Sequence, residues 1–355
     1  MSDMAELRQR INDIDRRLVA LLNERAAAAL EIVKVKDHEG LPVYAPDREA
    51  SVLRGVASLS GGPLPASAIT AIYREIISST RALQRVLVVT YLGPAGTFTH
   101  QAAREHFGTG VEYNPAETIE DVFNDVAKNK ADVGVVPIEN STGGVVNETL
   151  DAFMTCKLKI CDEIVLEIHH YLLGHGTLAE VKRVCSKPEA IAQCRVWLSE
   201  HLPHVELIPV ASTTAAAKMA AGEPGTAAIA SREAAELYTI ETLAENIEDR
   251  HENVTRFVVL GGQCGARTGR DRTSVMFAIR NEVGALYDML LPFKKHHVNL
   301  TKIESRPSKT KAWDYMFFVD MEGHAEDAEI AAALKEVEGS CRYVQILGSY
   351  PRAEG

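Results

Sequence analysis

The first 85 residues carry apolar positions with a helical period. Between residues 5 and 36 the apolar side chains alternate steps of four and three, and neither Gly nor Pro interrupts them. This pattern predicts one long helix with an apolar stripe. Shorter helices are predicted from about 47 to 59 and from about 66 to 85, on either side of the SGGP break at 60–63. The third helix is expected to turn five apolar side chains inward: Ile69, Ile72, Tyr73, Ile76 and Ile77. We therefore predict an all-helical domain over residues 1–85.

After residue 85 the pattern changes to short apolar runs that alternate with amphipathic segments. Strands are predicted at 86–92, 111–115, 131–139, 163–173, 183–186, 205–212, 226–231 and 254–261. Helical segments lie between most of them, for example at 118–130 and 188–200. This alternation is typical of α/β domains with mostly parallel sheets. Because there are two sets of strands and the last run can return to the first set, we predict a two-lobed α/β domain with a cleft over residues 86–265.

The remaining segment, residues 272–355, follows a third pattern. Its strands and helices are predicted in the order β-α-β-β-α-β, with the helices at 283–296 and 326–337. This order is the ferredoxin-like topology. The predicted fold class is therefore multidomain: an all-α domain, a two-lobed α/β domain and an α+β ferredoxin-like domain.

Net charge narrows the classes of function. The chain of 355 residues has a formal net charge of −11, which argues against nucleic acid as a partner. Residues 1–85 contribute +1 and the other 270 residues −12, so the helical domain is expected to have a task of its own. No apolar run is long enough for a membrane span, and the N-terminus lacks an apolar signal core. We therefore expect a cytoplasmic protein without a membrane partner.

The Cys and His residues give no metal signature. The six Cys form no CxxC pair, so we expect reduced thiols, no metal and no cofactor. The adjacent pairs His169–His170 and His296–His297 lack an HxxxH pattern. They are interpreted as ordinary surface or core histidines.

Cations interrupt the apolar stripe of the first helix. Arg25 occupies a stripe position, Lys36 lies one turn beyond Ile32, and Arg8 stands beside Leu7. A buried charge needs a partner, so Arg25 is expected to meet a structural Glu or an anionic ligand; the alternative is that these cations snorkel at a bundle edge. Arg8 and Arg25 are 17 residues apart, about 25 Å along a helix. A small ligand that contacts both therefore needs Arg8 from a second copy of the helix.

The pattern ELRQRIxxIDxxLxxLLxERxxxxxxIxxxK, followed by DREAxVL and IYREIIxxTxxLQ, resembles the α-helical chorismate mutases. The rearrangement of chorismate needs no proton transfer, only a folded dianion and stabilisation of the charge on the breaking C–O bond. The resemblance implies these contacts: Arg25 and, from a partner chain, Arg8 for the two carboxylates, Arg48 for orientation, Lys36 and Gln84 for the ether oxygen, and Glu49 and Thr80 for a hydroxyl or the ring. Ala45 departs from the Asp or Arg that many relatives carry nearby.

Four turns of the α/β region place Ser or Thr between a strand and a helix. They are GPAGTFT at 93–99, PIENSTGG at 137–144, VASTTAAA at 210–217 and AIASREAA at 228–235. Free N–H groups at helix N-termini bind anions, so turns that face one cleft predict a cage for a small ligand with carboxylates. Any single hydroxyl is equally well explained as a helix cap. GPAGTFT lacks the third Gly of GxGxxG, which disfavours a nucleotide.

GPAGTFT, PIENSTGG and NVTRFVVL together resemble prephenate dehydratase, and with the helical pattern the whole chain resembles the bifunctional chorismate mutase–prephenate dehydratases. The implied second reaction removes CO₂ and the ring hydroxyl of prephenate to give phenylpyruvate. Thr255 of the TRF motif is implied to be essential, as a polarising or relaying donor, because a Thr hydroxyl is too weak an acid to act alone. Glu139 is either the proton source or a structural acceptor. Arg256 either pairs with a carboxylate or braces the loop, and Phe257 is expected to form an apolar wall.

The other residues expected to orient prephenate come from the same motifs. They are Thr97, Phe98, Asn140, Ser141, Thr142, Gln193, Ser212, Thr213, Thr214 and Ser231. Gln193 matches a family glutamine, although the preceding SKPE departs from the usual His-Pro-Gln.

GAL at 284–286 and ESRP at 304–307 resemble the L-phenylalanine-binding motifs of ACT regulatory domains. The resemblance implies feedback inhibition by L-phenylalanine bound between two such domains. The implied contacts are Gly284, Ala285, Leu286, Glu304, Ser305, Arg306 and Pro307. Tyr287 departs from the smaller apolar residue common after GAL.

The expected partners are chorismate, prephenate, L-phenylalanine and a second copy of the chain in a homodimer, with a tetramer as the alternative. Two other functions stay open. One is a non-catalytic amino-acid sensor with an active or inactive mutase domain. The other is a chorismate mutase attached to an inert dehydratase-like domain.

Overall fold

The computed structural model describes residues 3–39, 44–250, 252–263, 265–279, 282–307 and 315–353, except for the side chains of 35–39. The chain divides into two compact units. The first is helical and contains residues up to Leu87 together with Phe107–Glu112; the second contains Val88–His106 and the chain from Tyr113 onward.

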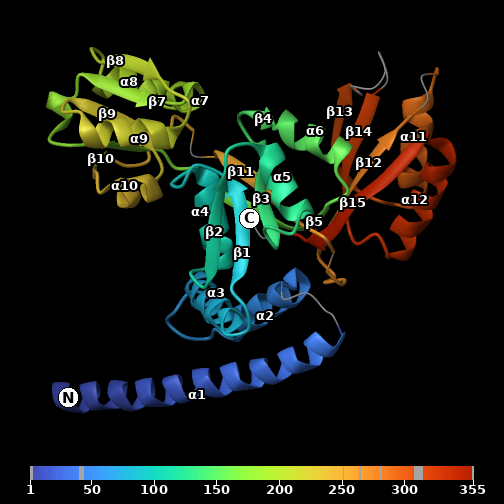
Figure 1. The fold of residues 1–355 in the computed structure, drawn as a ribbon, viewed down its shortest axis with the longest axis horizontal. Helices are drawn as coiled ribbons and strands as arrows, with labels where there is room; N and C mark the ends of the chain where they lie inside the picture. Colours follow the sequence, from blue (N-terminus) through green and yellow to red (C-terminus); the bar gives the residue numbers. More distant parts are fainter. Residues whose placement is uncertain are drawn as a thin grey trace. The chain divides into compact units, whose positions relative to one another are not determined.

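The helical unit contains the three helices that the apolar period predicts (Figure 1). They are α1 (Met4–Glu39), α2 (Pro46–Leu59) and α3 (Ala66–Ala82). Pro46 stands in the first turn of α2, where its missing N–H costs no hydrogen bond. Arg81 of α3 is 5% exposed. It pairs with Glu49 at 2.6 Å, donates to the carbonyl of Phe107 at 3.1 Å and lies over the ring of Tyr44.

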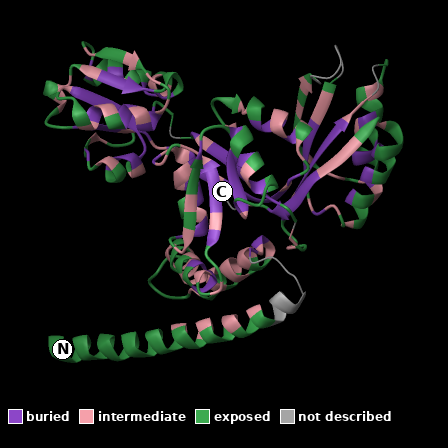
Figure 2. Cartoon of the chain, in the orientation of Figure 1, coloured by how far each residue is buried: buried purple, intermediate pink, exposed green. Residues whose placement is uncertain are grey.

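The apolar stripe of α1 is open in the single chain. Figure 2 shows exposed residues along most of α1. The exposed apolar side chains include Leu7, Ile11, Ile14, Leu18, Leu21 and Ile32. Ile72 of α3 is 49% exposed, so the expectation that it lies inward is wrong for one chain. A stripe of this length in water predicts a further partner.

The second unit begins with a lobe built on a sheet in the order β2-β1-β3-β11-β5, with β4 paired to β3. Its strands are β1 (Leu87–Leu92), β2 (Val111–Ala116), β3 (Val133–Asn140), β4 (Gly144–Val145), β5 (Lys159–Glu167) and β11 (Val254–Gly261). Its helices are α4 (Phe98–Phe107), α5 (Ile119–Ala127) and α6 (Asn147–Thr155). Strand β11 returns from the far end of the domain to lie between β3 and β5, as the sequence predicts.

The other lobe carries a sheet in the order β10-β6-β9-β7-β8. Its strands are β6 (Tyr171–Gly174), β7 (Arg183–Ser186), β8 (Glu206–Pro209), β9 (Thr226–Ala230) and β10 (Glu241–Ala244). Its helices are α7 (Pro188–Gln193), α8 (Arg195–His201), α9 (Thr213–Gly222) and α10 (Arg232–Tyr238), with a short 3-10 turn η1 (Leu178–Glu180).

Several local predictions for these lobes are wrong. The apolar run 163–173 is not one strand but the end of β5 and the start of β6, which belong to different sheets. The predicted helix 188–200 divides at Cys194, where Asp249 accepts the free N–H groups that open α8. The sheets are mixed rather than mostly parallel, because the returning and crossing strands run against their neighbours.

The C-terminal domain is the predicted ferredoxin-like unit. Its elements are β12 (Asp271–Ala278), α11 (Ala285–Lys295), β13 (Leu300–Pro307), β14 (Tyr315–Glu322), α12 (Ala328–Ser340) and β15 (Tyr343–Pro351). The strands lie in the order β13-β14-β12-β15, each antiparallel to its neighbours.

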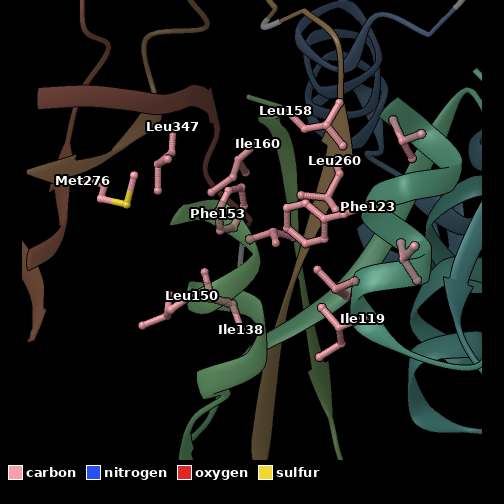
Figure 3. Packing of buried hydrophobic residues seen from close by; sticks show 14 of the residues in the cluster. Ile119, Phe123, Ile138, Leu150, Phe153, Leu158, Ile160, Leu260, Met276 and Leu347 are labelled. Atoms are coloured by element: carbon pink, nitrogen blue, oxygen red, sulfur yellow. The ribbon is translucent and has the colours of Figure 1, made fainter. Parts of the chain in front are cut away.

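The first lobe and the C-terminal domain share a hydrophobic core. Figure 3 shows Phe123 and Phe153 packed with Leu260 of the first lobe, on the side where Met276 and Leu347 of the C-terminal domain approach. All five side chains are at most 3% exposed. The two domains are therefore held together by continuous apolar packing. In the described part of the chain, no helix has the length and apolarity that a membrane span requires.

We predict that Gly348→Ala destabilises the protein by about 1–3 kcal/mol, the usual cost of overpacking. A Cβ at this position would lie 2.1 Å from the carbonyl oxygen of Ile160, so β15 would have to move away from β5. Urea unfolding followed by circular dichroism measures the change. The matched control is Gly339→Ala in α12, where a Cβ meets nothing within 4 Å; equal stability of the two variants would contradict the prediction.

Candidate functional site

The site is centred on two polar side chains that face each other across β3 and β11. Asn140 pairs with Thr255 in the register of the two strands. The Asn140 amide nitrogen donates to the Thr255 hydroxyl oxygen at 2.8 Å. Among the described residues nothing accepts a hydrogen bond from that hydroxyl, so the proton of Thr255 is available to a ligand.

The orientation of the Asn140 amide is fixed by the backbone. Its oxygen accepts from the N–H groups of Thr142 at 3.0 Å and Gly143 at 2.7 Å. Only an oxygen can accept from two N–H donors, so the amide nitrogen has to point to Thr255.

Asn140 can face Thr255 because β3 contains one extra residue. Arg256 lies opposite Glu139, but Phe257 lies opposite Pro137, so Ile138 has no partner on β11. Such a bulge shifts the alternation of side chains by one position. Ile138 and Glu139 consequently face α6 and the C-terminal domain, whereas Asn140 faces the other side of the sheet. A bulge also tolerates Pro137, which lacks an N–H for the ladder.

Gln193 of the other lobe reaches the same polar group. It donates to the Thr142 hydroxyl at 2.8 Å and accepts from Asn253 at 3.1 Å. Asn253 in turn accepts from the Asn140 amide nitrogen at 2.8 Å. Ser141 exchanges hydrogen bonds with the backbone of Glu252 and Val254. These side chains form one connected network, so the hydroxyls of Ser141 and Thr142 are occupied as supports.

The turns of the two lobes meet at Gly96, as the cage interpretation expects. A Cβ at Gly96, whose φ is +84°, would lie within 3.5 Å of Ala234, Leu237 and Thr214. The Ser231 hydroxyl donates to the Gly96 carbonyl at 2.8 Å and also caps α10. The close approach of the two lobes here requires a residue without a side chain.

Some of the predicted hydroxyls in these turns act as helix caps, the alternative weighed from the sequence. Ser212 caps α9 and Thr97 bonds within its own turn. The Thr214 hydroxyl is buried without a partner among the described residues, and Thr213 is 8% exposed. Phe98 packs edge-to-face on His170 at 5.5 Å, while Phe257 is fully buried in the sheet.

Glu139 and Arg256 lie on the opposite face of the sheet from the Thr255 hydroxyl. Arg256 is 6% exposed; it pairs with Glu139 at 2.7 Å and with Glu163 at 3.4 Å, and donates to Asp320 of β14 at 2.6 Å. Lys302 of β13 pairs with the second Glu139 oxygen. Arg256 therefore braces the junction with the C-terminal domain, and Glu139 serves there as an acceptor between two cations.

Burial and charge oppose each other in this cluster. Burial by itself raises the pKa of Asp320, but the Arg256 guanidinium and the Ser274 hydroxyl outweigh it and hold that pKa below its usual range. Burial likewise disfavours the charged form of Arg256, yet Asp320 and the other nearby anions raise its pKa. Asp320 and Arg256 thus hold each other in their charged forms. For Glu163, burial outweighs the opposing charges of Arg272 and Arg256 and raises the pKa of its carboxyl.

The predicted mutase residues are spread over the helical unit. Arg25 is half-buried with its guanidinium 6.0 Å from the centre of the Tyr73 ring, and in the described residues no carboxylate pairs with it. Arg8 and Arg48 are exposed, and Thr80 is buried with its hydroxyl donating to Ile76. Glu49 pairs with Arg81, as described above, and Gln84 follows the end of α3. The side chain of Lys36 lies outside the described residues.

The predicted effector residues divide between two faces of β13. Ser305 and Pro307 are exposed, whereas Glu304 and Arg306 are half-buried on the face toward the first lobe. Arg306 makes a double contact with Asp151 of α6 at 2.8 and 2.9 Å. Gly284 precedes α11 with φ +86°, a conformation that favours glycine. Ala285, Leu286 and Tyr287 form the first turn of α11.

Sequence reasoning missed Asn253, His170, Lys302 and Asp320. Asn253 stands two positions before Thr255, and the strand period could have placed it on the same side. Lys302 and Asp320 gave no signal, because the packing between domains decides their role. No group of three or more His, Cys, Asp or Glu in the described ranges could hold a metal ion.

Comparisons with known proteins find relatives for all three parts of the chain. Family models match residues 7–85 (chorismate mutase type II), 89–264 (prephenate dehydratase) and 273–339 (ACT domain). A bifunctional chorismate mutase/prephenate dehydratase from Aquifex aeolicus is 46% identical over 358 residues, which cover 99% of each chain.

Solved structures agree for the second unit. A prephenate dehydratase from Arthrobacter aurescens, in complex with L-Phe, has a TM-score of 0.70 and 36% identity, covering 75% of this chain and 90% of that one. A protein described as GqqA, a novel type of quorum quenching acylase, has a TM-score of 0.69 and 29% identity, covering 75% and 98%. Similar folds can thus carry different chemistry, so the site has to decide the function.

The three matched domains, together with the polar site at Asn140 and Thr255, define a multidomain enzyme with a regulatory domain. The chain belongs to the family of bifunctional chorismate mutase/prephenate dehydratases. Its helical domain is a chorismate mutase domain, its two-lobed domain a prephenate dehydratase domain, and its C-terminal domain an ACT domain. The fold class and the family predicted from the sequence are confirmed.

Proposed function

We propose that this chain rearranges chorismate to prephenate in a domain of residues 1–85 and converts prephenate to phenylpyruvate in a domain of residues 86–265. A domain of residues 272–355 senses L-phenylalanine. The observation that carries the dehydratase assignment is the hydrogen bond from Asn140 to the Thr255 hydroxyl.

The proposed dehydratase step uses the Thr255 hydroxyl as a hydrogen-bond donor. The ring carboxylate of prephenate leaves as CO₂, its bonding electrons complete the aromatic ring, and the ring hydroxyl departs with the electron pair of its C–O bond. The Asn140 amide donates to one lone pair of the Thr255 oxygen, so the Thr255 O–H can donate a hydrogen bond to the departing hydroxyl. The proton that converts this hydroxyl to water comes from the solvent, because a Thr hydroxyl is too weak an acid to supply it. Such a donor stabilises the charge that develops in the transition state.

The sequence left two roles open for Glu139, a proton source or a structural acceptor. We propose that it is a structural acceptor. Its carboxylate contacts Arg256 and Lys302 on the face of the sheet opposite Thr255. The half-buried ring of Phe98 remains available to orient prephenate, in addition to Thr255, whereas the Thr214 hydroxyl is buried.

We expect Thr255→Val to lower the dehydratase rate by about 100-fold or more, the scale of a lost catalytic donor. Valine keeps the shape of threonine and removes the hydroxyl. Thr255→Ser keeps the hydroxyl and should retain most of the rate. Phenylpyruvate is followed by its enolate absorbance in alkali, and the mutase rate of the same variant should be unchanged. A near-normal rate for Thr255→Val would refute the assignment.

The mutase site is proposed to be shared by two chains, so that the protein is at least a homodimer. Arg8 and Arg25 lie on the single helix α1, too far apart for one small dianion. The exposed apolar stripe of α1 supplies the surface on which a second, antiparallel α1 would pack.

We also propose that the protein is located in the cytoplasm. The five described cysteines are free thiols, which suits a reducing compartment.

Mixing Arg8→Ala protein with Arg25→Ala protein should restore mutase activity. In a mixed dimer one site contains both substitutions and the other contains neither, so free exchange should leave about a quarter of all sites intact. Each variant alone should be inactive. Absence of recovery, with exchange verified by mass spectrometry of differently tagged chains, would show that each site belongs to a single chain.

L-phenylalanine is proposed to act through the two faces of β13. Ser305 lies on its exposed face, while Lys302 and Arg306 on the other face hold Glu139 and Asp151 of the dehydratase domain. A ligand that shifts β13 would therefore shift the strand that carries Asn140. Such coupling is typically worth about 1–3 kcal/mol.

We expect L-phenylalanine to inhibit the dehydratase activity of the wild type and to leave a Ser305→Ala, Gly284→Val variant uninhibited. The valine fills the space at Gly284 where a ligand would approach the backbone, and the alanine removes a polar contact. Thr301→Ala, on the same exposed face of β13, is the control and should respond like the wild type. A wild type that neither responds nor binds L-phenylalanine by calorimetry would leave the ACT domain with a structural role.

A further inference from the structure

His170 is a buried histidine in the hinge of the dehydratase domain, the segment 168–170 that connects β5 to β6. It lies in the short segment between β5 and β6, where the chain crosses from one lobe to the other, and it is 2% exposed. Its backbone N–H donates to the Glu248 carboxylate at 2.8 Å, and its ring packs against the edge of Phe98. Its Nε2 atom lies 2.7 Å from the side-chain oxygen of Gln193. Its Nδ1 atom is buried without a partner in the described part of the chain.

The directions of the hydrogen bonds around Gln193 follow from the backbone. Two backbone N–H groups fix the oxygen of Asn140, so its nitrogen faces the oxygen of Asn253. Asn253 therefore presents its own nitrogen to the Gln193 oxygen. Gln193 consequently presents its nitrogen to the Thr142 hydroxyl. The Thr142 hydroxyl in turn donates a hydrogen bond to the Asn140 oxygen. Each of the three amides in this hydrogen-bond network therefore has one permitted orientation.

This orientation also determines the form of the histidine. The Gln193 oxygen can only accept, so the Nε2 atom of His170 has to carry a proton. Burial lowers the pKa of His170, against the opposing hydrogen bond to Gln193 and the charge of Glu248. His170 is therefore neutral near pH 7, with a proton on Nε2 and a bare Nδ1.

We propose that His170 is a positioning residue for the dehydratase reaction: its Nε2–H holds the Gln193 side chain in place, and Gln193, through Thr142 and Asn253, braces the Asn140 amide against Thr255. The proposal rests on the proposed dehydratase function. Without a donor at Nε2, the Gln193 oxygen keeps only Asn253 as a partner. The Gln193 side chain is then held less firmly, so Thr142 and Asn253 lose part of their support. His170 itself need not touch prephenate.

The test compares three substitutions in the full-length protein. His170→Gln places an amide N–H at the reach of Nε2, His170→Asn is too short to do so, and His170→Phe keeps a ring against Phe98 without any donor. We expect the Phe and Asn variants to lose about 10- to 100-fold in dehydratase kcat, the scale of a misplaced catalytic group, with KM changed much less. His170→Gln should recover most of kcat. His175→Phe, at an exposed histidine, is the control for ring substitution.

Two results would overturn the proposal. One is a His170→Phe variant with the kcat of the wild type; the other is a His170→Gln variant as impaired as the Phe variant. Circular dichroism and urea unfolding of each full-length variant report whether the unit that contains His170 is folded, because the mutase rate reports only on the helical unit. A wild type that forms no phenylpyruvate would instead refute the dehydratase function itself, so the two failures are distinguishable.

A spectroscopic measurement tests the form of the His170 ring directly, without reference to catalytic rates. In ¹H–¹⁵N correlation spectra of protein labelled at histidine, one ring should show a protonated Nε2 and a bare Nδ1 throughout the neutral range. This signal should vanish in His170→Gln, which assigns it. A ring protonated on Nδ1, or on both nitrogens at pH 7, would contradict the derived orientation of Gln193.

Discussion

The dehydratase site depends on a single extra residue in strand β3. Ile138 has no partner on β11, and this bulge turns Glu139 and Asn140 to the faces opposite those that a regular strand would give them. Asn140 thereby meets Thr255, and Glu139 meets Arg256 and Lys302. In a regular ladder the amide would face the hydrophobic core shared with the ACT domain, and the carboxylate would face the hinge. The position of Pro137 beside the extra residue fits a bulge, since proline cannot support the ladder of a central strand.

The two faces of the same strand pair differ in chemistry. On one face, uncharged amides and hydroxyls orient the Thr255 hydroxyl; on the other, Arg256 gathers the carboxylates of Glu139, Glu163 and Asp320. A buried arginine with several anions is stable only as a complete set, because removing one member leaves the others uncompensated. A shift of β13 or β14 would change the charge balance directly behind Thr255, as the proposed coupling to the ACT domain requires.

The helical domain shows a different constraint. Its longest helix leaves an apolar stripe in water, and Arg25 stands in that stripe with an aromatic ring beside it. The proposed dimer would account for both features, because a second helix would cover the stripe and an anionic substrate would pair with Arg25. The two proposed sites would then differ in origin: the dehydratase site is formed within one domain, whereas the mutase site combines residues of two chains.

The sequence by itself determined the order and type of the domains, because hydrophobic period is a local property: the steps of three and four, the short apolar runs and the βαββαβ order all reappear as elements. It also determined the family, through the TRF, ENS and ELRQRI motifs.

The sequence did not determine which sheet the run 163–173 belongs to, because a strand and a crossing between sheets have the same apolar composition. Nor did it separate the roles of Glu139 and Asn140. Neighbours on a strand take opposite faces, but the shift in register between β11 and β3 decides which of the two faces each residue takes. His170 looked like an ordinary core histidine until the packing of two lobes brought Gln193 to its ring. Pairing register and contacts between distant segments are long-range properties, and only the tertiary structure decides them.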